Sequence, residues 1–170
     1  MNNIFIPSVS ATDGKTIEVQ ILKDNNSDNL IITGLIDEEI EESVYLSLSN
    51  LKRLGFGIPK FLHIHFKDYN YRKAGISASL GIYLLLFSFI NNMELKKTYM
   101  VTGEIDLFGN VYSIGGVKQK YSLFKNLDLD YFIVPYGNIS DLNKTDVSIK
   151  SVSNLNKLIN IVEECENEIK

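Results

Sequence analysis

Two short segments of the sequence hold residue types suited to nucleophilic catalysis. The first is Arg72 to Gly81 (RKAGISASLG), in which Ser77 and Ser79 stand at the start of a long apolar run. Backbone N–H groups at the start of a helix can hold a developing oxyanion beside such a serine. The structural alternative is that Ser77 or Ser79 only caps the helix, a common use of a serine at this position.

The second segment is Ser113 to Lys120 (SIGGVKQK), which ends with two lysines. Its paired glycines let the backbone pass close to another element, and a helix follows. Lys118 and Lys120 are two residues apart, which separates them by about 200° around a helix axis. One of them can therefore face inward while the other faces solvent. Because lysines are mostly exposed, the pattern alone leaves both of them as surface residues.

Other reactive residues form no familiar site. His63 and His65 are spaced to face the same side of a strand, but no carboxylate or cysteine motif completes a metal site, so packing or hydrogen bonding is favoured. The single cysteine, Cys165, lies between Glu164 and Glu166, which make a thiol a poor nucleophile. The sequence contains no GxxxxGK[ST], GxGxxG, HExxH or G-x-S-x-G motif. We expect neither a metal nor a cofactor.

The composition suits a single folded domain that positions these segments. The chain has 170 residues, of which 45 % are hydrophobic and 22 % are charged, and this excludes wholesale disorder. We expect one domain over residues 1–170. The net charge of −4 argues against a dedicated nucleic-acid binder, which would usually be basic. One cysteine excludes an intramolecular disulfide framework.

Hydrophobic periodicity predicts strands in the first third of the chain and alternating strands and helices afterwards. Strands are expected at residues 4–10, 16–22, 30–33, 61–66, 98–101, 131–134 and 147–152, and a hairpin at 105–113 that turns at Gly109-Asn110. The polar segment 23–29 is interpreted as a hairpin loop. Helices are expected at residues 37–55, 76–90, 117–126 and 154–168. The order of these strands and helices predicts an α+β (mixed α/β) fold with one mixed sheet and several packed helices.

The uncharged run from Ala74 to Met93 is the only stretch that resembles a membrane span. Ser and Gly interrupt its apolar part, which is shorter than the roughly 20 residues that a span needs. A buried core helix is therefore favoured, and we expect no membrane partner. The first residues carry no basic stretch followed by an apolar run, so no secretory signal is indicated and a cytoplasmic protein is expected.

Three motifs, in order, carry a resemblance to a known family. Met100 to Lys120 (MVTGEIDLFGNVYSIGGVKQK) resembles the signature of the proteolytic domain of Lon (endopeptidase La), in which TGEI, a glycine-turn hairpin and GG-x-K-x-K follow one another. His63 to His65 is similar to the family's His-x-His strand, and Arg72 to Ser79 resembles its serine loop, usually written PKDGPSAG. The resemblance is strongest from residue 61 to residue 142 and extends to Thr33-Gly34 and the following helix.

The resemblance implies a serine–lysine dyad. It places the nucleophile on Ser77 and the base on Lys120, 43 residues further on, which is the family's spacing, and it makes Thr102 the residue that orients the lysine. An ordinary lysine is protonated at neutral pH, so the base must be buried to lower its pKa. The implied function is a serine endopeptidase that hydrolyses peptide bonds in flexible or partner-delivered polypeptides.

The serine loop departs from the family pattern at several positions. Ala74 replaces the acidic residue, Ile76 the proline and Ser79 the glycine. Full-length Lon also carries an ATPase module, and this chain has none, so we expect a stand-alone domain; a separate ATPase partner and a homo-oligomer stay open. Similar domains without the intact dyad occur in DNA-repair ATPases and magnesium-chelatase-like proteins. The alternative function is therefore a non-catalytic interaction or regulatory module.

Overall fold

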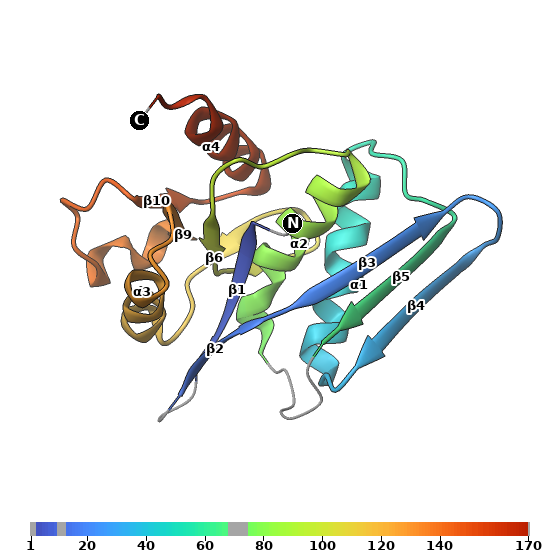
Figure 1. Ribbon diagram of the computed structural model, residues 1–170, viewed down its shortest axis with the longest axis horizontal. Helices are drawn as coiled ribbons and strands as arrows, with labels where there is room; N and C mark the ends of the chain where they lie inside the picture. The colour runs from blue at the N-terminus through green and yellow to red at the C-terminus, as the bar shows by residue number, and fades with distance from the viewer. Residues whose placement is uncertain (1–2, 10–12, 68–74, 170) are drawn as a thin grey trace.

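The fold combines helices with three β-sheets, which confirms the predicted α+β class (Figure 1). A computed structural model describes residues 3–9, 13–67 and 75–169. A five-stranded sheet has the order β10-β9-β6-β1-β2, and a three-stranded sheet has the order β3-β5-β4. The third sheet is a short hairpin of β7 and β8.

The five-stranded sheet is parallel except at one edge. Its strands are β1 (Ile4–Val9), β2 (Gly14–Ile17), β6 (Tyr99–Val101), β9 (Tyr131–Pro135) and β10 (Ile149–Val152). Only β2 runs antiparallel to its neighbour, β1. The four parallel strands therefore present their carboxyl ends at the same edge of the sheet.

The three-stranded sheet is also mixed. β5 (Phe61–Phe66) lies in the middle, antiparallel to β3 (Val19–Asp24) and parallel to β4 (Asn29–Gly34). The short hairpin joins β7 (Glu104–Ile105) to β8 (Val111–Tyr112). Its turn is centred on Leu107 and Phe108 and is closed by the Gly109 N–H, which donates to the Asp106 carbonyl oxygen at 3.3 Å, so it lies two residues before the predicted Gly109-Asn110.

Two predictions about strand pairing are wrong. The single expected sheet is divided because the chain leaves the first sheet at Glu18: β2 pairs with β1, whereas β3 runs on to pair with β5 (Figure 1). Residues 23–29 are not a hairpin loop, because β5 lies between β3 and β4. Alternation of apolar and polar residues shows that a strand has one buried face, but it does not identify the strand's neighbours.

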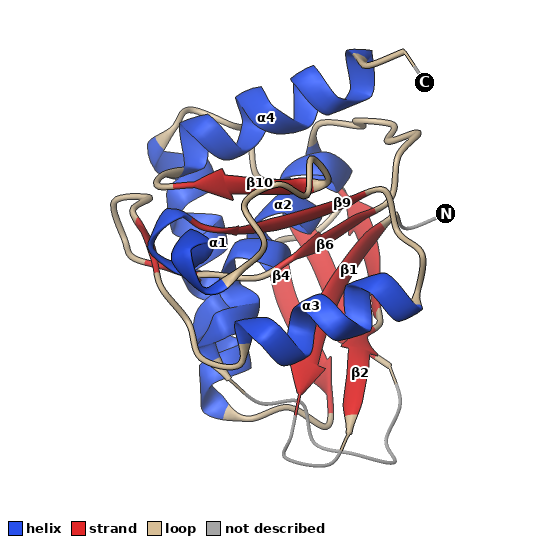
Figure 2. Ribbon diagram, turned by 90° about the vertical axis from the view of Figure 1, so that its left-hand side faces the viewer, coloured by secondary structure: helices blue, strands red, loops and turns tan. Residues whose placement is uncertain are grey.

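Helices cover both faces of the five-stranded sheet (Figure 2). On one face α3 (Val117–Asn126) packs its Val117 and Phe124 against Phe132 and Val134 of β9. On the other face lies the main core, which receives Tyr131 and Ile133 from the same strand. Alternate residues of β9 therefore serve two different cores, so this strand is buried on both sides.

The main core is built around α2 (Ser79–Ile90), which follows the short 3-10 helix η1 (Ile76–Ala78). Residues 79–88 are all buried, so the predicted core helix is confirmed. A Cβ on Gly81 would stand only 2.8 Å from the Ile6 side chain, so a glycine permits this close packing of α2 on β1. Within the described part of the chain, no helix has the length and apolar character that crossing a membrane requires.

Two amphipathic helices complete the main core. In α1 (Glu38–Arg53), Asp37 accepts a hydrogen bond from the Ile40 backbone N–H, and Ile40, Val44 and Leu51 are fully buried. In α4 (Leu155–Asn167), Asn154 caps the first turn in the same way. Both caps satisfy N–H groups that a helix start leaves unpaired.

Candidate active site

Lys120 is a buried lysine on the inner face of α3. Val117, Lys120 and Phe124 follow each other at helical spacing and are the buried residues of this helix. Only 3 % of Lys120 is exposed, whereas Lys118 lies on the exposed side. The expectation that one of the two lysines faces inward and the other faces solvent is confirmed, and Lys120 is the one that faces the interior.

The amine of Lys120 meets two hydroxyl groups. Its Nζ lies 3.0 Å from Ser77 Oγ and 3.1 Å from Thr102 Oγ1. Ser77 comes from η1 at the start of the core helix, and Thr102 directly follows β6 at the carboxyl edge of the sheet. The structure thus brings together all three residues that the sequence analysis assigned to the site.

Backbone contacts hold the serine against the segment after β6. The Ser77 carbonyl oxygen accepts a hydrogen bond from the Gly103 N–H at 3.0 Å and one from Thr102 Oγ1 at 3.4 Å. The Leu80 N–H donates to the Gly103 carbonyl oxygen at 3.0 Å. Neither Ser77 nor Ser79 caps a helix with its side chain, so the capping alternative is wrong.

Gly103 permits this close approach. A Cβ at this position would lie 2.8 Å from the Leu80 side chain, and its φ of +159° is a value that other residues rarely adopt. The glycine of the TGE motif therefore lets the backbone beside Thr102 touch the start of α2. A larger residue would separate Thr102 from Ser77.

Burial sets the charge state of Lys120. Loss of hydration lowers the pKa of its amine from 10.5 to about 8, because removal from water disfavours the ammonium form. Both of its hydrogen-bond partners among the described residues are uncharged hydroxyls. A lysine in these surroundings can lose its proton near neutral pH and then accept one from an adjacent hydroxyl.

Ser79 has a structural contact that the sequence analysis missed. Its fully buried hydroxyl donates to the Gly103 carbonyl oxygen at 3.2 Å and accepts from the Ile105 N–H at 2.9 Å. The only sequence signal was a serine where the resembled loop has a glycine. Ala74, at the position of that loop's acidic residue, lies outside the described residues.

The remaining candidate residues have structural partners. His63 Nε2 and His65 Nδ1 lie 2.9 Å and 2.8 Å from Thr33 Oγ1, so both face the same side of the sheet, as predicted. Cys165 is buried in the main core, and burial raises the pKa of its thiol to about 11. Over residues 3–9, 13–67 and 75–169, no three His, Cys, Asp or Glu side chains are grouped to hold a metal ion.

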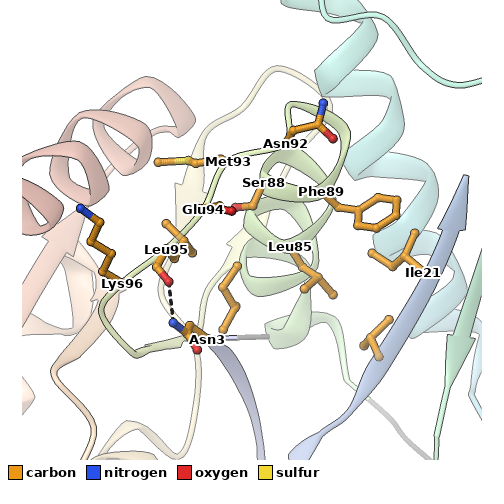
Figure 3. A pocket seen from close by; sticks show the side chains of 12 residues that line it. Asn3, Ile21, Leu85, Ser88, Phe89, Asn92, Met93, Glu94, Leu95 and Lys96 are labelled. Atoms are coloured by element: carbon orange, nitrogen blue, oxygen red, sulfur yellow. Dashed lines mark hydrogen bonds between the residues drawn. The ribbon is translucent and has the colours of Figure 1, made fainter. Parts of the chain in front are cut away.

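A hollow of about 620 Å³ opens at the opposite end of α2 (Figure 3). Leu85 and Phe89 of α2 and Ile21 of β3 line it, and on its rim the Asn3 side-chain amide donates to the Leu95 carbonyl oxygen at 2.6 Å. Its lining includes none of the three assigned residues. The arrangement suited to chemistry lies at the start of α2.

Sequence comparison shows the family of this chain. The family model for the Lon protease (S16) C-terminal proteolytic domain matches residues 8–169. The chain belongs to the Lon protease family. The match covers almost the whole chain and includes Ser77, Thr102 and Lys120.

Curated Lon proteases are similar over most of the chain. The Lon protease of Aster yellows witches'-broom phytoplasma is 31 % identical over 156 residues, which cover 87 % of this chain and 20 % of that protein. The peroxisomal Lon protease homolog 2 of Caenorhabditis elegans is 30 % identical over 149 residues, or 84 % and 19 % of the two chains. The Lon protease of Mycoplasma mycoides is 28 % identical over 147 residues, or 82 % and 18 %. The chain thus spans about a fifth of the length of these relatives.

Two departures from the Lon serine loop lie within the described residues. Ile76, at the position of the usual proline, is the half-buried first residue of η1. Ser79, at the position of the usual glycine, is the buried serine that bonds Gly103 and Ile105. This Lon domain therefore joins its serine loop to the TGE segment with a side chain.

Proposed function

We propose that this Lon domain is a serine peptidase in which Ser77 is the nucleophile and Lys120 is the general base. The observation that carries the proposal is the 3.0 Å separation between Ser77 Oγ and the buried Lys120 Nζ. A serine hydroxyl is a weak nucleophile and needs a base within hydrogen-bond reach. Burial of Lys120 supplies that base at a pH near neutrality.

The hydrogen bonds are consistent with a neutral amine. In this state the Ser77 hydroxyl donates its proton toward the lone pair of Lys120 Nζ, and one Nζ–H donates to Thr102 Oγ1. The Thr102 hydroxyl proton then points to the Ser77 carbonyl oxygen. Each contact has one donor and one acceptor, so Thr102 orients the amine and leaves its lone pair for Ser77.

The reaction divides into two acyl-transfer steps. As Ser77 Oγ attacks the peptide carbonyl carbon, Lys120 takes the hydroxyl proton and later gives it to the departing amine, which leaves an acyl-enzyme. Lys120 then takes a proton from water, the resulting hydroxide attacks the ester, and the proton returns to Ser77 Oγ. Backbone N–H groups around Ser77, at the start of η1, would hold the oxyanion that forms in each step.

The proposed substrates are flexible polypeptides or polypeptides delivered by a partner. Because the full-length Lon proteins that the chain resembles carry an ATPase module, an ATPase partner that unfolds and delivers substrates is part of the proposal. We further propose that residues 1–170 form one domain that hydrolyses an unstructured chain by itself. A stably folded substrate would not reach Ser77 without such a partner.

Hydrolysis of an unstructured polypeptide tests the proposal. The purified protein should cleave casein or a fluorogenic peptide, and Ser77→Ala should abolish cleavage. Ser88→Ala is the matched control, because Ser88 is a buried serine of α2 that donates only within its helix, to the Leu84 carbonyl oxygen. Absence of cleavage by the wild-type protein would instead favour the alternative, a non-catalytic interaction or regulatory module.

A further inference from the structure

We propose that Ser79 is a positioning residue for the Ser77–Lys120 pair. Its hydroxyl fastens the segment after Thr102 to the start of α2, and so keeps the Thr102 hydroxyl against the Lys120 amine. This inference rests on the proposed function, because it concerns how the same site is held. Ser79 itself has no contact with the reacting atoms.

The Ser79 hydroxyl forms hydrogen bonds with two backbone groups of residues 103–105, the segment that follows Thr102. It donates to the Gly103 carbonyl oxygen at 3.2 Å and accepts from the Ile105 N–H at 2.9 Å. Ser79 is completely buried and Ile105 is nearly so. Because water does not reach the Ile105 amide, loss of the hydroxyl would leave that amide without its partner, which is costly inside a protein.

Residues 103–105 directly follow Thr102, the residue that orients Lys120. Thr102 is held on one side by its own N–H, which donates to the Ile133 carbonyl oxygen of β9 at 3.1 Å. On the other side Gly103 is held to Ser77 and Leu80 by backbone bonds and to Ser79 by its hydroxyl. Of these contacts only the last comes from a side chain, so a substitution removes it without altering the backbone.

A shift of this segment would affect Lys120 directly. The Thr102 hydroxyl lies 3.1 Å from Lys120 Nζ, and the Gly103 backbone touches Ser77. Movement of the segment away from α2 would lengthen the contact with the amine and admit water beside it. Partial hydration of the amine favours the ammonium form, so a smaller fraction of Lys120 would be neutral and able to accept a proton near neutral pH.

The glycine of the usual Lon loop offers no hydroxyl at this position. A domain with that glycine holds its TGE segment without this side-chain contact, whereas this chain uses Ser79. Ser79→Gly therefore removes the contact without adding any atom that could clash. Ser79→Ala removes only the oxygen.

A titration of Lys120 tests the inference without any need for hydrolysis. Lysines labelled with ¹³C at Cε are followed by NMR against pH, and the Lys120 signal is assigned by its loss in Lys120→Met. In Ser79→Ala we expect the Lys120 pKa to rise by about one unit toward its ordinary value. Amide exchange at Ile105 should accelerate at least roughly tenfold, because its hydrogen bond is lost.

Ser88→Ala is the matched control, since it removes a buried hydroxyl from the same helix. It should change neither the Lys120 pKa nor the rate of amide exchange at Ile105. If Ser79→Ala proves unstable, Ser79→Gly provides the same comparison and should shift the pKa in the same direction. An unchanged Lys120 pKa and unchanged Ile105 exchange in a folded Ser79 variant would overturn the inference.

Hydrolysis kinetics separate this inference from the proposed function. Ser79→Ala should lower kcat roughly tenfold and leave KM unchanged, because Ser79 does not touch the substrate. If the Lys120 pKa shifts as expected while the wild-type protein cleaves nothing, the positioning contact is supported and the peptidase proposal fails. If the wild type cleaves and Ser79→Ala has normal kcat with a normal Lys120 pKa, Ser79 does not position the pair.

Discussion

Lys120 Nζ lies 3.0 Å from Ser77 Oγ, although the two residues belong to elements that cover opposite faces of the five-stranded sheet. They meet where β6 ends, and Thr102 supplies the second hydroxyl for the amine at this point. The lysine has lost most of its hydration, and its partners among the described residues are uncharged.

The two lysines of the GGVKQK segment should differ in function. Lys120→Arg should lower kcat for peptide hydrolysis by at least about a hundredfold, because guanidinium keeps its proton in proteins and cannot act as a base. Lys118→Arg should retain nearly the full rate, because that side chain lies on the exposed side of α3. Steady-state cleavage of an unstructured polypeptide measures both variants. Normal turnover by Lys120→Arg with an inactive Lys118→Arg would show that the base is assigned to the wrong residue.

The rate of hydrolysis should rise with pH and level off above an apparent pKa of about 8. The amine is active only when neutral, and burial brings its pKa down from 10.5 to about 8. The measurement is kcat/KM against pH on a substrate with no titrating group in this range. A midpoint near the ordinary lysine value, or a rate that falls over this range, contradicts a buried neutral amine.

Replacement of Lys120 by an apolar residue should stabilise the fold at neutral pH. The folded-state pKa is depressed, so below pH 8 the folded protein must hold a buried charge, and this costs about 3 kcal/mol. Between pH 8 and 10.5 the unfolded chain binds more protons than the folded one, so wild-type stability rises with pH. The advantage of Lys120→Met in the free energy of unfolding should therefore be largest near pH 7 and shrink toward pH 10.5. Urea unfolding at several pH values tests this, and a constant advantage would contradict it.

The hydroxyl of Thr102 should contribute more to kcat than the branched shape of its side chain. Thr102→Val keeps the branched side chain but removes the acceptor for Lys120 Nζ and the donor to the Ser77 carbonyl oxygen. We expect kcat to fall roughly tenfold or more in this variant. Thr102→Ser keeps the hydroxyl and should retain most of the activity. Equal losses in the two variants would indicate that packing, and not the hydrogen bond, is the contribution of Thr102.

The sequence was sufficient to predict most of the elements and the three residues, Ser77, Thr102 and Lys120, that the fold brings together. Acidic residues after Asp37 and the spacing of Ile40 and Val44 predicted α1, because capping and amphipathic periodicity are local properties. The motifs around Ser77, Thr102 and Lys120 predicted which residues would meet. Local periodicity alone could not do so, because it places a lysine on the surface.

Strand neighbours and the contacts of Ser79 could not be predicted. β3 and β4 follow each other in sequence, yet β5 lies between them, and their alternating pattern is compatible with either arrangement. Ser79 stands in a segment where its local pattern indicates a helix start. Its partners, Gly103 and Ile105, are more than 20 residues away and approach it only in the folded chain.

Covalent labelling of Ser77 tests the central claim most directly. A serine-directed fluorophosphonate is incubated with the wild-type protein, Lys120→Met and Lys118→Met across pH 6 to 10, and the adduct is located by mass spectrometry. The account predicts one adduct on Ser77, formed at a rate that rises through an apparent pKa of about 8 in the wild type and Lys118→Met, and almost no adduct in Lys120→Met. A Ser77 that is not labelled, or that is labelled equally fast without Lys120, would contradict activation of the serine by the buried lysine.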